Sequence, residues 1–334
     1  AFVPNKSFPD TDYLVFGAFV QDEIGIGPVK VTPGLRFDSF RYTPNPDALY
    51  RVNNTVEPSS LNDSALSPKL GVVWKLAPMA QVFAQYAHGF KAPKPSQING
   101  GVSNLNVTPG PSNSGNYKTI GNPNLKSETS DSVELGLRGR SEDAKRSYSV
   151  AVFHAKYKDF ILENQLIESN THPTPDVSQS INLNSVTISG FELRGEWAFA
   201  TGWSVSAAYA HAEGDSVSNG VSTPLVTIDP DKLMVGLNYA SGTRWGGAAH
   251  LTAVDRKSRN PDSTMVTPSG YGVVNLSAWY NFSKATRLTG GIDNVFDKKY
   301  VEWADVRDLA ATSTAVDAFT QPGRNFKVSL THSF

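Results

Sequence analysis

The side chains that could carry covalent chemistry do not form a recognisable catalytic set. The chain of 334 residues has 6 histidines and no cysteine, which excludes a cysteine nucleophile, a disulfide framework and a thiolate metal site. It contains no G-x-S-x-G, H-E-x-x-H or P-loop motif, so no serine nucleophile, zinc site or phosphate cradle is indicated. Serines and carboxylates are abundant, and spacing alone leaves a chance triad open. We predict that the protein is not an enzyme.

The elements that position these side chains are predicted to be β-strands. Apolar and polar residues alternate with a period of two through almost the whole chain, which is the pattern of a strand with two different faces. The clearest examples are the segments 68–76, 203–209, 233–239, 274–282 and 326–334. About thirteen such segments are present, most of them near the 9–11 residues that a tilted strand needs to cross a bilayer.

The predicted strands and the connections between them follow a regular order. The strands are 12–24, 28–42, 65–76, 79–90, 126–140, 145–161, 178–198, 202–213, 231–240, 244–255, 270–282, 286–296 and 323–334. The long connections are 43–64, 91–125, 162–177, 214–230, 256–269 and 297–322, and they alternate strictly with short turns. Such segregation is typical of an outer-membrane barrel, with tight turns on one side and long loops on the other. We therefore predict an all-β fold, an antiparallel transmembrane β-barrel. A secreted β-sandwich or β-solenoid is the alternative.

Composition narrows the class of protein further. Lys and Arg number 30 and Asp and Glu 31, for a formal net charge of -1, which argues against a nucleic-acid partner. No run approaches about 18 consecutive apolar residues, so no transmembrane helix is predicted. The 17 Phe, 12 Tyr and 6 Trp argue against disorder. Many of these aromatics fall near strand ends, where membrane-interface girdles belong, although ordinary β-propensity places aromatics in strands too.

Two short boxes carry a family resemblance. The first is Phe90-Lys91-Ala92-Pro93, and the second, after a long loop, is Asn122-Pro123-Asn124-Leu125. Together they resemble the FRAP and NPNL boxes of TonB-dependent outer-membrane receptors for haem and haemoglobin. The segments 67–71, 186–193, 293–300 and 321–326 agree with the same family. The terminal Phe334, which closes an alternating strand, resembles the C-terminal assembly signal of outer-membrane barrels.

The resemblance implies a place for this chain in a larger molecule. The family has a barrel of 22 strands around an N-terminal plug, so residues 1–334 are expected to be the C-terminal part of the barrel domain, about thirteen strands, with the plug domain missing from this chain. The N-terminus lacks the features of a signal peptide. The implied partners are the TonB–ExbB–ExbD complex, acting through the missing plug, the barrel-assembly machinery, and lipid or lipopolysaccharide.

Candidate cargo ligands also follow from the resemblance. Haem receptors of this family usually place an iron-ligating histidine between the two boxes, but residues 94–121 contain none. Tyr117 lies in this interval, and phenolate is a known ligand of haem iron. His172 lies in the next long loop. His88 shares a face with apolar residues and is interpreted either as a rim residue at the membrane interface or as a cargo contact.

The predicted function is import of an iron-bearing cargo, most specifically haem, across the bacterial outer membrane. Haemoglobin or another haem carrier is the expected source. A ferric-siderophore receptor of the same architecture and a passive porin are the alternatives. Haem or a ferric complex would be transported cargo and not a permanently bound cofactor, and no resident metal site is predicted. The loop 297–322 contains Trp303, Asp305, Arg307 and Phe319, a mixture suited to contact with a protein partner.

Overall fold

Thirteen long strands form the body of the molecule. The computed structural model describes residues 6–54, 57–105, 116–170, 174–307 and 309–334. The long strands are β1 (Asp10–Gln21), β3 (Val29–Asn45), β4 (Leu61–Ala77), β5 (Ala80–Lys91), β8 (Glu128–Arg140), β9 (Arg146–Glu168), β10 (Asp176–Ala200), β11 (Trp203–Ser218), β13 (Lys232–Ser241), β14 (Trp245–Val254), β15 (Tyr271–Asn281), β16 (Thr286–Asp293) and β17 (Asn325–His332). Each predicted strand overlaps one of them, which confirms the all-β prediction.

Short strands and helices lie in the connections between the long strands. The short strands are β2 (Ile24–Ile26), β6 (Gly101–Leu105), β7 (Asn116–Ile120) and β12 (Val221–Pro224). The helices are α1 (Ala48–Asn53), α2 (Pro95–Asn99), α3 (Trp303–Val306) and the 3₁₀ turn η1 (Val316–Phe319). No helix in the described ranges is long and apolar enough to cross a membrane.

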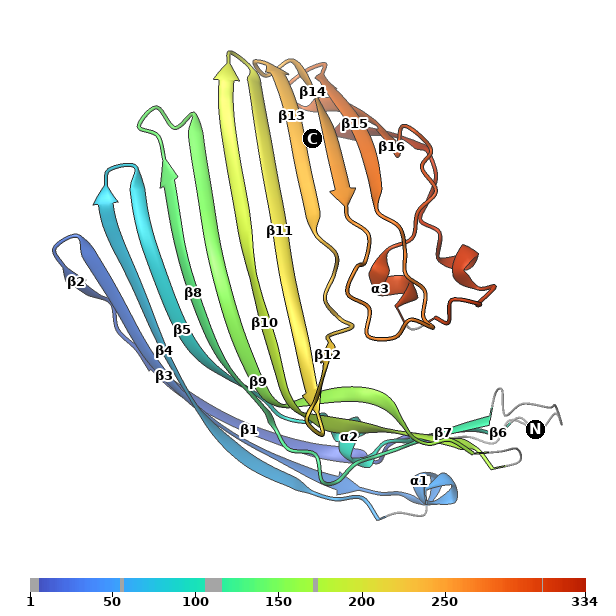
Figure 1. Cartoon of the computed structure of the whole chain (residues 1–334). Coiled ribbons are helices and arrows are strands. Elements are labelled where there is room, and N and C mark those ends of the chain that lie inside the picture. The colour runs from blue at the N-terminus through green and yellow to red at the C-terminus, as the bar shows by residue number, and fades with distance from the viewer. Residues whose placement is uncertain (1–5, 55–56, 106–115, 171–173, 308) are drawn as a thin grey trace.

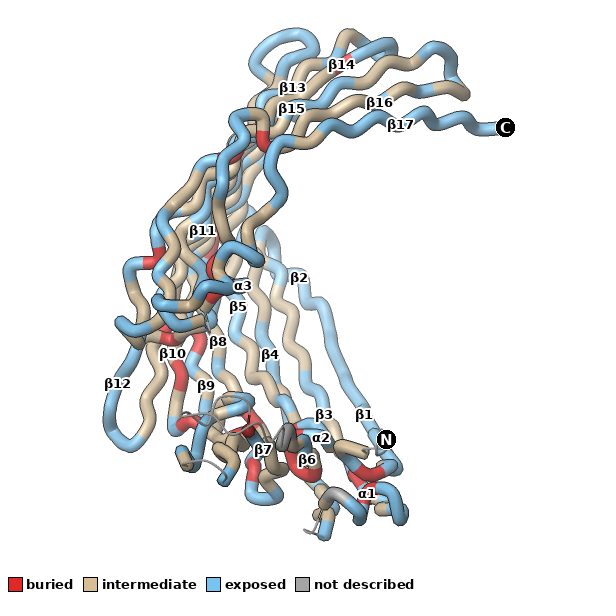
Figure 2. The backbone as a smooth tube through the Cα atoms, turned by 90° about the vertical axis from the view of Figure 1, so that its right-hand side faces the viewer, coloured by how far each residue is buried: buried red, intermediate tan, exposed pale blue. Residues whose placement is uncertain are grey.

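The strands pair into one curved sheet. Each long strand pairs antiparallel with the next long strand along the chain, from β1 with β3 to β16 with β17. All seventeen strands belong to this single sheet, which excludes the alternative of two sheets packed face to face. Figure 2 shows the curvature from the side. Within the described residues, β1 and β17 are its two edges.

The register gives the sheet two chemically different faces. Leu137, Val150, Leu193, Tyr209 and Leu233 lie side by side across five strands. Their chain neighbours Arg138, Ser149, Arg194, Ala208 and Met234 line up on the opposite side. We call the first the outer face and the second the inner face. Large apolar side chains on the outer face remain exposed, because no second layer covers them.

The two ends of the strands differ as predicted. Figure 1 shows tight turns, with the small strand β2, at one end and the helices and the small strands β6, β7 and β12 at the other. The predicted loop 162–177 is the largest departure, because β9 continues to Glu168 and β10 begins at Asp176. The apolar alternation stops where the outer face becomes polar, whereas hydrogen-bonded pairing continues beyond that point. The sequence pattern therefore marked the end of the apolar band and not the end of the strands.

Close packing is confined to the long-loop end. Phe40, Tyr42 and Ile98 form one buried cluster there, and Leu183, Val186 and Leu225 form another. Figure 2 shows buried segments concentrated near α1, α2, β6 and β7. A single-layer sheet has no opposing layer to pack against, so apolar residues become buried only where the loops fold over the strand ends.

Candidate functional site

A buried carboxylate, three residues after the second box, contacts the first box. Lys91 is the last residue of β5 and faces Glu128, the first residue of β8, in the strand register. The Lys91 Nζ lies 3.1 Å from both carboxylate oxygens of Glu128, whose side chain is only 8% exposed. The same carboxylate accepts a hydrogen bond from the Ile161 backbone N–H of β9 at 2.8 Å. The first box and the strand that follows the second box are thereby linked to β9.

The first box leads the chain out of the sheet into a buried turn. Pro93 is almost completely buried, and Phe90 and Ala92 pack against the cluster around Ile98. Proline has no N–H to continue a strand ladder, so the pairing ends here and α2 follows. The Gln97 side chain of α2 accepts a hydrogen bond from the Lys94 N–H at 2.7 Å and donates one to Glu163 of β9 at 2.7 Å.

The second box forms a turn that is bonded to α2 and β10. The Asn122 backbone N–H donates to the Gln97 carbonyl at 2.8 Å, and its side-chain Nδ2 donates to the Ser180 carbonyl at 2.9 Å. Its Oδ1 accepts from the Asn124 N–H at 3.0 Å. Leu125 is buried, whereas Pro123 and Asn124 are exposed at the tip. The box residues therefore hold the loop base in place rather than present free polar groups.

Asn182, which no sequence motif identifies, binds the residue that follows the second box. Its Oδ1 accepts from the Lys126 N–H at 2.9 Å, and its Nδ2 donates to the Lys126 carbonyl at 3.1 Å and the Asp159 carbonyl at 2.6 Å. One amide side chain thus satisfies backbone groups of two other segments. No local signal identifies it, because an isolated Asn within a strand pattern is common.

The candidate cargo ligands lie in different surroundings. Tyr117 is in β7, opposite Asn104 of β6 and beside Asp176 of β10, and its side chain is exposed. Its phenol is open to a ligand at the far end of the loop bundle. His172 lies outside the described residues. In the part of the chain that the structure covers, no group of three or more metal-ligating side chains comes together.

His88 lies on the outer face and is held by a carboxylate. Its Nδ1 is 2.9 Å from the Asp131 Oδ1, and the Tyr86 hydroxyl donates to the same oxygen at 2.7 Å. The arrangement recurs where Tyr209 and His211 both bond to Asp231. In each case a Tyr-Ala-His tripeptide bonds to an aspartate: Asp131 lies within the next long strand, β8, and Asp231 lies immediately before the next long strand, β13. The repeated Tyr-Ala-His sequence could have indicated that the two places have the same local contacts.

Contacts around Trp303 hold the last long loop against two neighbouring loops. Trp303 of α3 is buried, and its Nε1 donates to the Val226 carbonyl at 2.8 Å. The Lys257 Nζ lies 5.0 Å from the centre of the Trp303 ring and donates to the Ile228 carbonyl. Burial lowers the pKa of the Lys257 ammonium group. The prediction that Trp303 serves a partner surface is wrong, because packing against Lys257 occupies its ring. Phe319 remains exposed.

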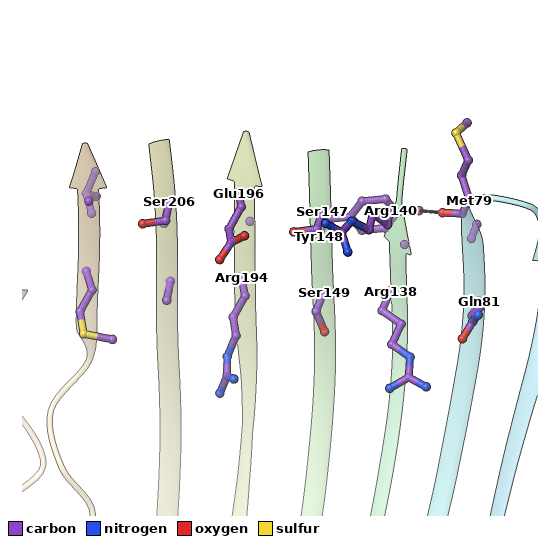
Figure 3. Close-up of a pocket in the computed structure, with 18 of the residues that line it drawn as sticks. Met79, Gln81, Arg138, Arg140, Ser147, Tyr148, Ser149, Arg194, Glu196 and Ser206 are labelled. Atoms are coloured by element: carbon purple, nitrogen blue, oxygen red, sulfur yellow. Dashed lines mark hydrogen bonds between the residues drawn. The ribbon is translucent and has the colours of Figure 1, made fainter. Parts of the chain in front are cut away.

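A cavity of about 780 Å³ opens on the inner face near the short turns, and Arg138, Arg194 and Glu196 are among the residues that line it. Figure 3 shows the Arg138 and Arg194 side chains running along their strands, away from those turns. Arg194 pairs with Glu192 at 2.8 Å, and the Arg138 guanidinium lies 5.3 Å from the centre of the Phe83 ring. Arg138 and Arg194 therefore bring positive charge to the inner face of the sheet.

Similarity to known proteins places the chain in a family. The family model described as "TonB dependent receptor-like, beta-barrel" matches residues 1–295 of the chain. The chain is 23% identical to the Hemoglobin-haptoglobin utilization protein B of Neisseria meningitidis serogroup C, over 91% of this chain and 42% of that protein. It is 27% identical to the Ferric enterobactin receptor PirA of Pseudomonas aeruginosa, over 98% of this chain and 42% of that protein.

Solved structures share the fold. The Copper transporter OprC superposes with a TM-score of 0.77 at 22% identity, over 97% of this chain and 48% of that one. The chain thus spans less than half the length of each of these relatives. The match over residues 1–295, together with the single antiparallel sheet and the paired boxes, shows that the chain belongs to the TonB-dependent receptor β-barrel family.

Proposed function

We propose that this chain forms part of an outer-membrane receptor that imports an iron-bearing cargo, specifically haem. The observation that carries the proposal is the buried Glu128, which links the first box and the strand after the second box to β9 at the base of the long-loop bundle. A receptor needs loops that hold a fixed shape above its interior, and this junction supplies a rigid base for them. The exposed Tyr117 phenol lies in the bundle that the junction supports.

The two faces of the sheet support a transport role. The outer face is apolar and suited to lipid, and the inner face is polar and suited to a water-filled interior. Cargo captured by the loops would pass along the inner face, and no covalent step is required. Energy would come from the TonB–ExbB–ExbD complex through a plug domain, and the barrel-assembly machinery would recognise the strand that ends in Phe334. The bacterial outer membrane is the proposed location.

Haem is the preferred cargo and a ferric siderophore is the second candidate. Relatives named for haemoglobin-haptoglobin use favour haem, and so does the phenolate that Tyr117 offers to iron. The relative named as a ferric enterobactin receptor favours a siderophore. Haemoglobin or another haem carrier would be the source of haem. A passive porin lacks support, because the family's members are receptors that couple to TonB.

Titration of the complete protein with hemin, followed by absorption spectroscopy, tests the cargo. We expect a shifted Soret band that saturates at one hemin per protein. The double variant Tyr117→Phe, His172→Gln should lose the shift. The matched control Tyr148→Phe, His332→Gln, which alters the same residue types on the strands, should keep it. Saturable binding of a ferric siderophore with no hemin shift would replace haem by a siderophore, and binding of neither would overturn the import proposal.

A further inference from the structure

A row of cations crosses the inner face near the short turns. Arg138 of β8 and Arg194 of β10 both lie opposite Ser149 of β9 (Figure 3). Lys75 of β4 lies opposite Gln81 of β5, which in turn faces Arg138. Neighbouring strands are about 4.8 Å apart, so successive cations in the row are separated by roughly 10 Å. The row therefore presents positive charge at regular intervals along this end of the inner face.

The two arginines keep donor groups available for a ligand. Both are exposed on the inner face. Arg194 donates to Glu192 at 2.8 Å, yet 69% of its side chain remains exposed. Among the described residues, Arg138 makes no ion pair, and its guanidinium lies over the Phe83 ring. Arginine presents five N–H donors in a planar fork that matches the two oxygens of a carboxylate. The pair can therefore hold two carboxylates of one molecule.

The cavity of about 780 Å³ places an apolar surface beside this charge. Arg194 lies next to Ala208 of β11, and Ala208 lies next to Met234 of β13, which is 48% exposed. The lining has three arginines and one glutamate: Arg138, Arg140, Arg194 and Glu196. A volume of about 300–1,000 Å³ is typical of pockets that hold small organic molecules. The cavity is thus cationic on one side, apolar on the other and large enough for an organic ligand.

We propose that this cavity is a second binding site for the cargo, in which Arg138 and Arg194 hold the two propionate carboxylates of haem while the ring lies against Ala208 and Met234. The inference rests on the proposed function, because it takes haem as the cargo. Charge-assisted bonds from arginine to carboxylate are among the strong hydrogen bonds of proteins. Haem has both acidic groups at one edge of an apolar ring, which matches the division of the cavity. An inorganic anion would leave the apolar side uncovered.

The position of the cavity makes it a site of passage. It lies at the short-turn end of the inner face, whereas the long loops that would capture haem lie at the other end. Haem would reach it after leaving the loops, once the plug domain of the complete protein has opened the path. Titration at equilibrium therefore still counts one hemin per protein, and the second site acts on the rate of transport.

Uptake of radiolabelled hemin by cells that produce the complete protein tests the site, with hemin binding to the purified proteins measured in parallel. The variant Arg138→Gln, Arg194→Gln should bind hemin like wild type and import it at least tenfold more slowly, because the loss of one charge-assisted hydrogen bond lowers occupancy roughly tenfold. The variant Arg138→Lys, Arg194→Lys keeps the charge and should recover part of the rate. Hemin dimethyl ester, which has no free carboxylate, should enter wild-type and variant cells at the same slow rate.

The matched control removes two exposed cations from other places on the inner face. Lys69 lies on the same face of β4 as Lys75, and Arg287 of β16 lies opposite Asn281 of β15; neither lines the cavity. The variant Lys69→Gln, Arg287→Gln should import hemin like wild type.

Three results would each overturn the second site: equal uptake by the two glutamine double variants, weaker hemin binding that accounts for the slower uptake, or an equal slowing of hemin and its ester. The last would mean that the arginine pair serves another part of the protein and not the cargo. Hemin binding by wild type would leave the import proposal standing in all three cases, and its absence would overturn both proposals.

Discussion

At the scale of single residues, Glu128 has the most demanding environment in the loop base. It is a buried carboxylate that accepts one ammonium group and one backbone N–H. A buried charge costs free energy unless it is paired and hydrogen-bonded. Lys91 supplies the charge partner but is half exposed, so the Ile161 N–H depends on Glu128 more strongly than Lys91 does.

We therefore expect Glu128→Ala to loosen the link from the first box to β9. The Ile161 N–H would be left buried without an acceptor, which costs about 1–3 kcal/mol. Hydrogen exchange of the Ile161 amide, followed by mass spectrometry, should speed up accordingly. Lys91→Gln serves as the comparison and should have a smaller effect, because a largely exposed ion pair contributes about 1 kcal/mol or less. Equal exchange rates in the two variants would contradict this assignment.

Because Lys257 packs against Trp303 of α3, the stability of this loop is expected to depend on pH. Burial lowers the pKa of Lys257 below its ordinary value of 10.5 in the folded loop, while the unfolded loop keeps the ordinary value. Between the lowered pKa and 10.5 the unfolded state binds more protons, so the stability of the loop rises as the pH rises through this window.

The measurement is the urea midpoint for exposure of Trp303 at several pH values. Wild type should show a midpoint that increases toward pH 10.5. Lys257→Met keeps an unbranched side chain beside the indole without a titrating group, so its midpoint should lack this component. A parallel pH slope in the two proteins would show that another group is responsible.

At the scale of elements, the alternation within each strand decides which residues face the outer side. Leu276 and Ser277 are neighbours on β15, and the register places Leu276 beside Ala249 and Ser277 beside Ala248. Leu276 belongs to the apolar outer face and Ser277 to the inner face. The two positions differ only in the face that they occupy, which makes them a matched pair.

Leu276→Arg should impair insertion, and Ser277→Arg should be tolerated. An arginine facing lipid near the middle of a bilayer costs about 2–4 kcal/mol, whereas an inner-face arginine stays in water. The folded fraction of the complete protein in lipid vesicles, read from heat-modifiable gel migration, distinguishes the two. A similar loss of folding in both variants would contradict the assignment of faces.

At the scale of the whole molecule, the exposed apolar face requires lipid or detergent around the chain. Residues such as Leu14, Phe37, Leu135 and Val328 lie exposed in one single-layer sheet. A soluble monomer rarely exposes contiguous apolar patches beyond a few hundred Å². Lipid or detergent removes this surface from water, which an aqueous buffer does not.

The complete protein should therefore sediment as aggregate in buffer without detergent and as a discrete particle in micelles. Analytical ultracentrifugation after detergent exchange measures this directly. The variant Lys145→Gln, Lys284→Gln controls for a general loss of charge and should behave like wild type. A monodisperse species in detergent-free buffer would mean that another part of the protein covers the outer face.

Residue patterns within the chain were enough to predict the strands, their order and their faces. Period-two alternation is a local property, and short turns between neighbouring strands leave antiparallel pairing as the simplest connection. The thirteen strands and the tight turns of the structure follow from this. Strand ends were less well predicted, because pairing continues past the apolar band into 162–168.

The side-chain contacts among the long loops became known from the three-dimensional fold alone. Glu128 with Ile161, Asn182 with Lys126, and Lys257 with Trp303 each join segments far apart in the chain. Such contacts depend on the register of neighbouring strands and on the path of each loop, which no local pattern encodes. Trp303 illustrates the reason: its sequence neighbourhood suggests a surface aromatic, and the three-dimensional fold of the loops buries it.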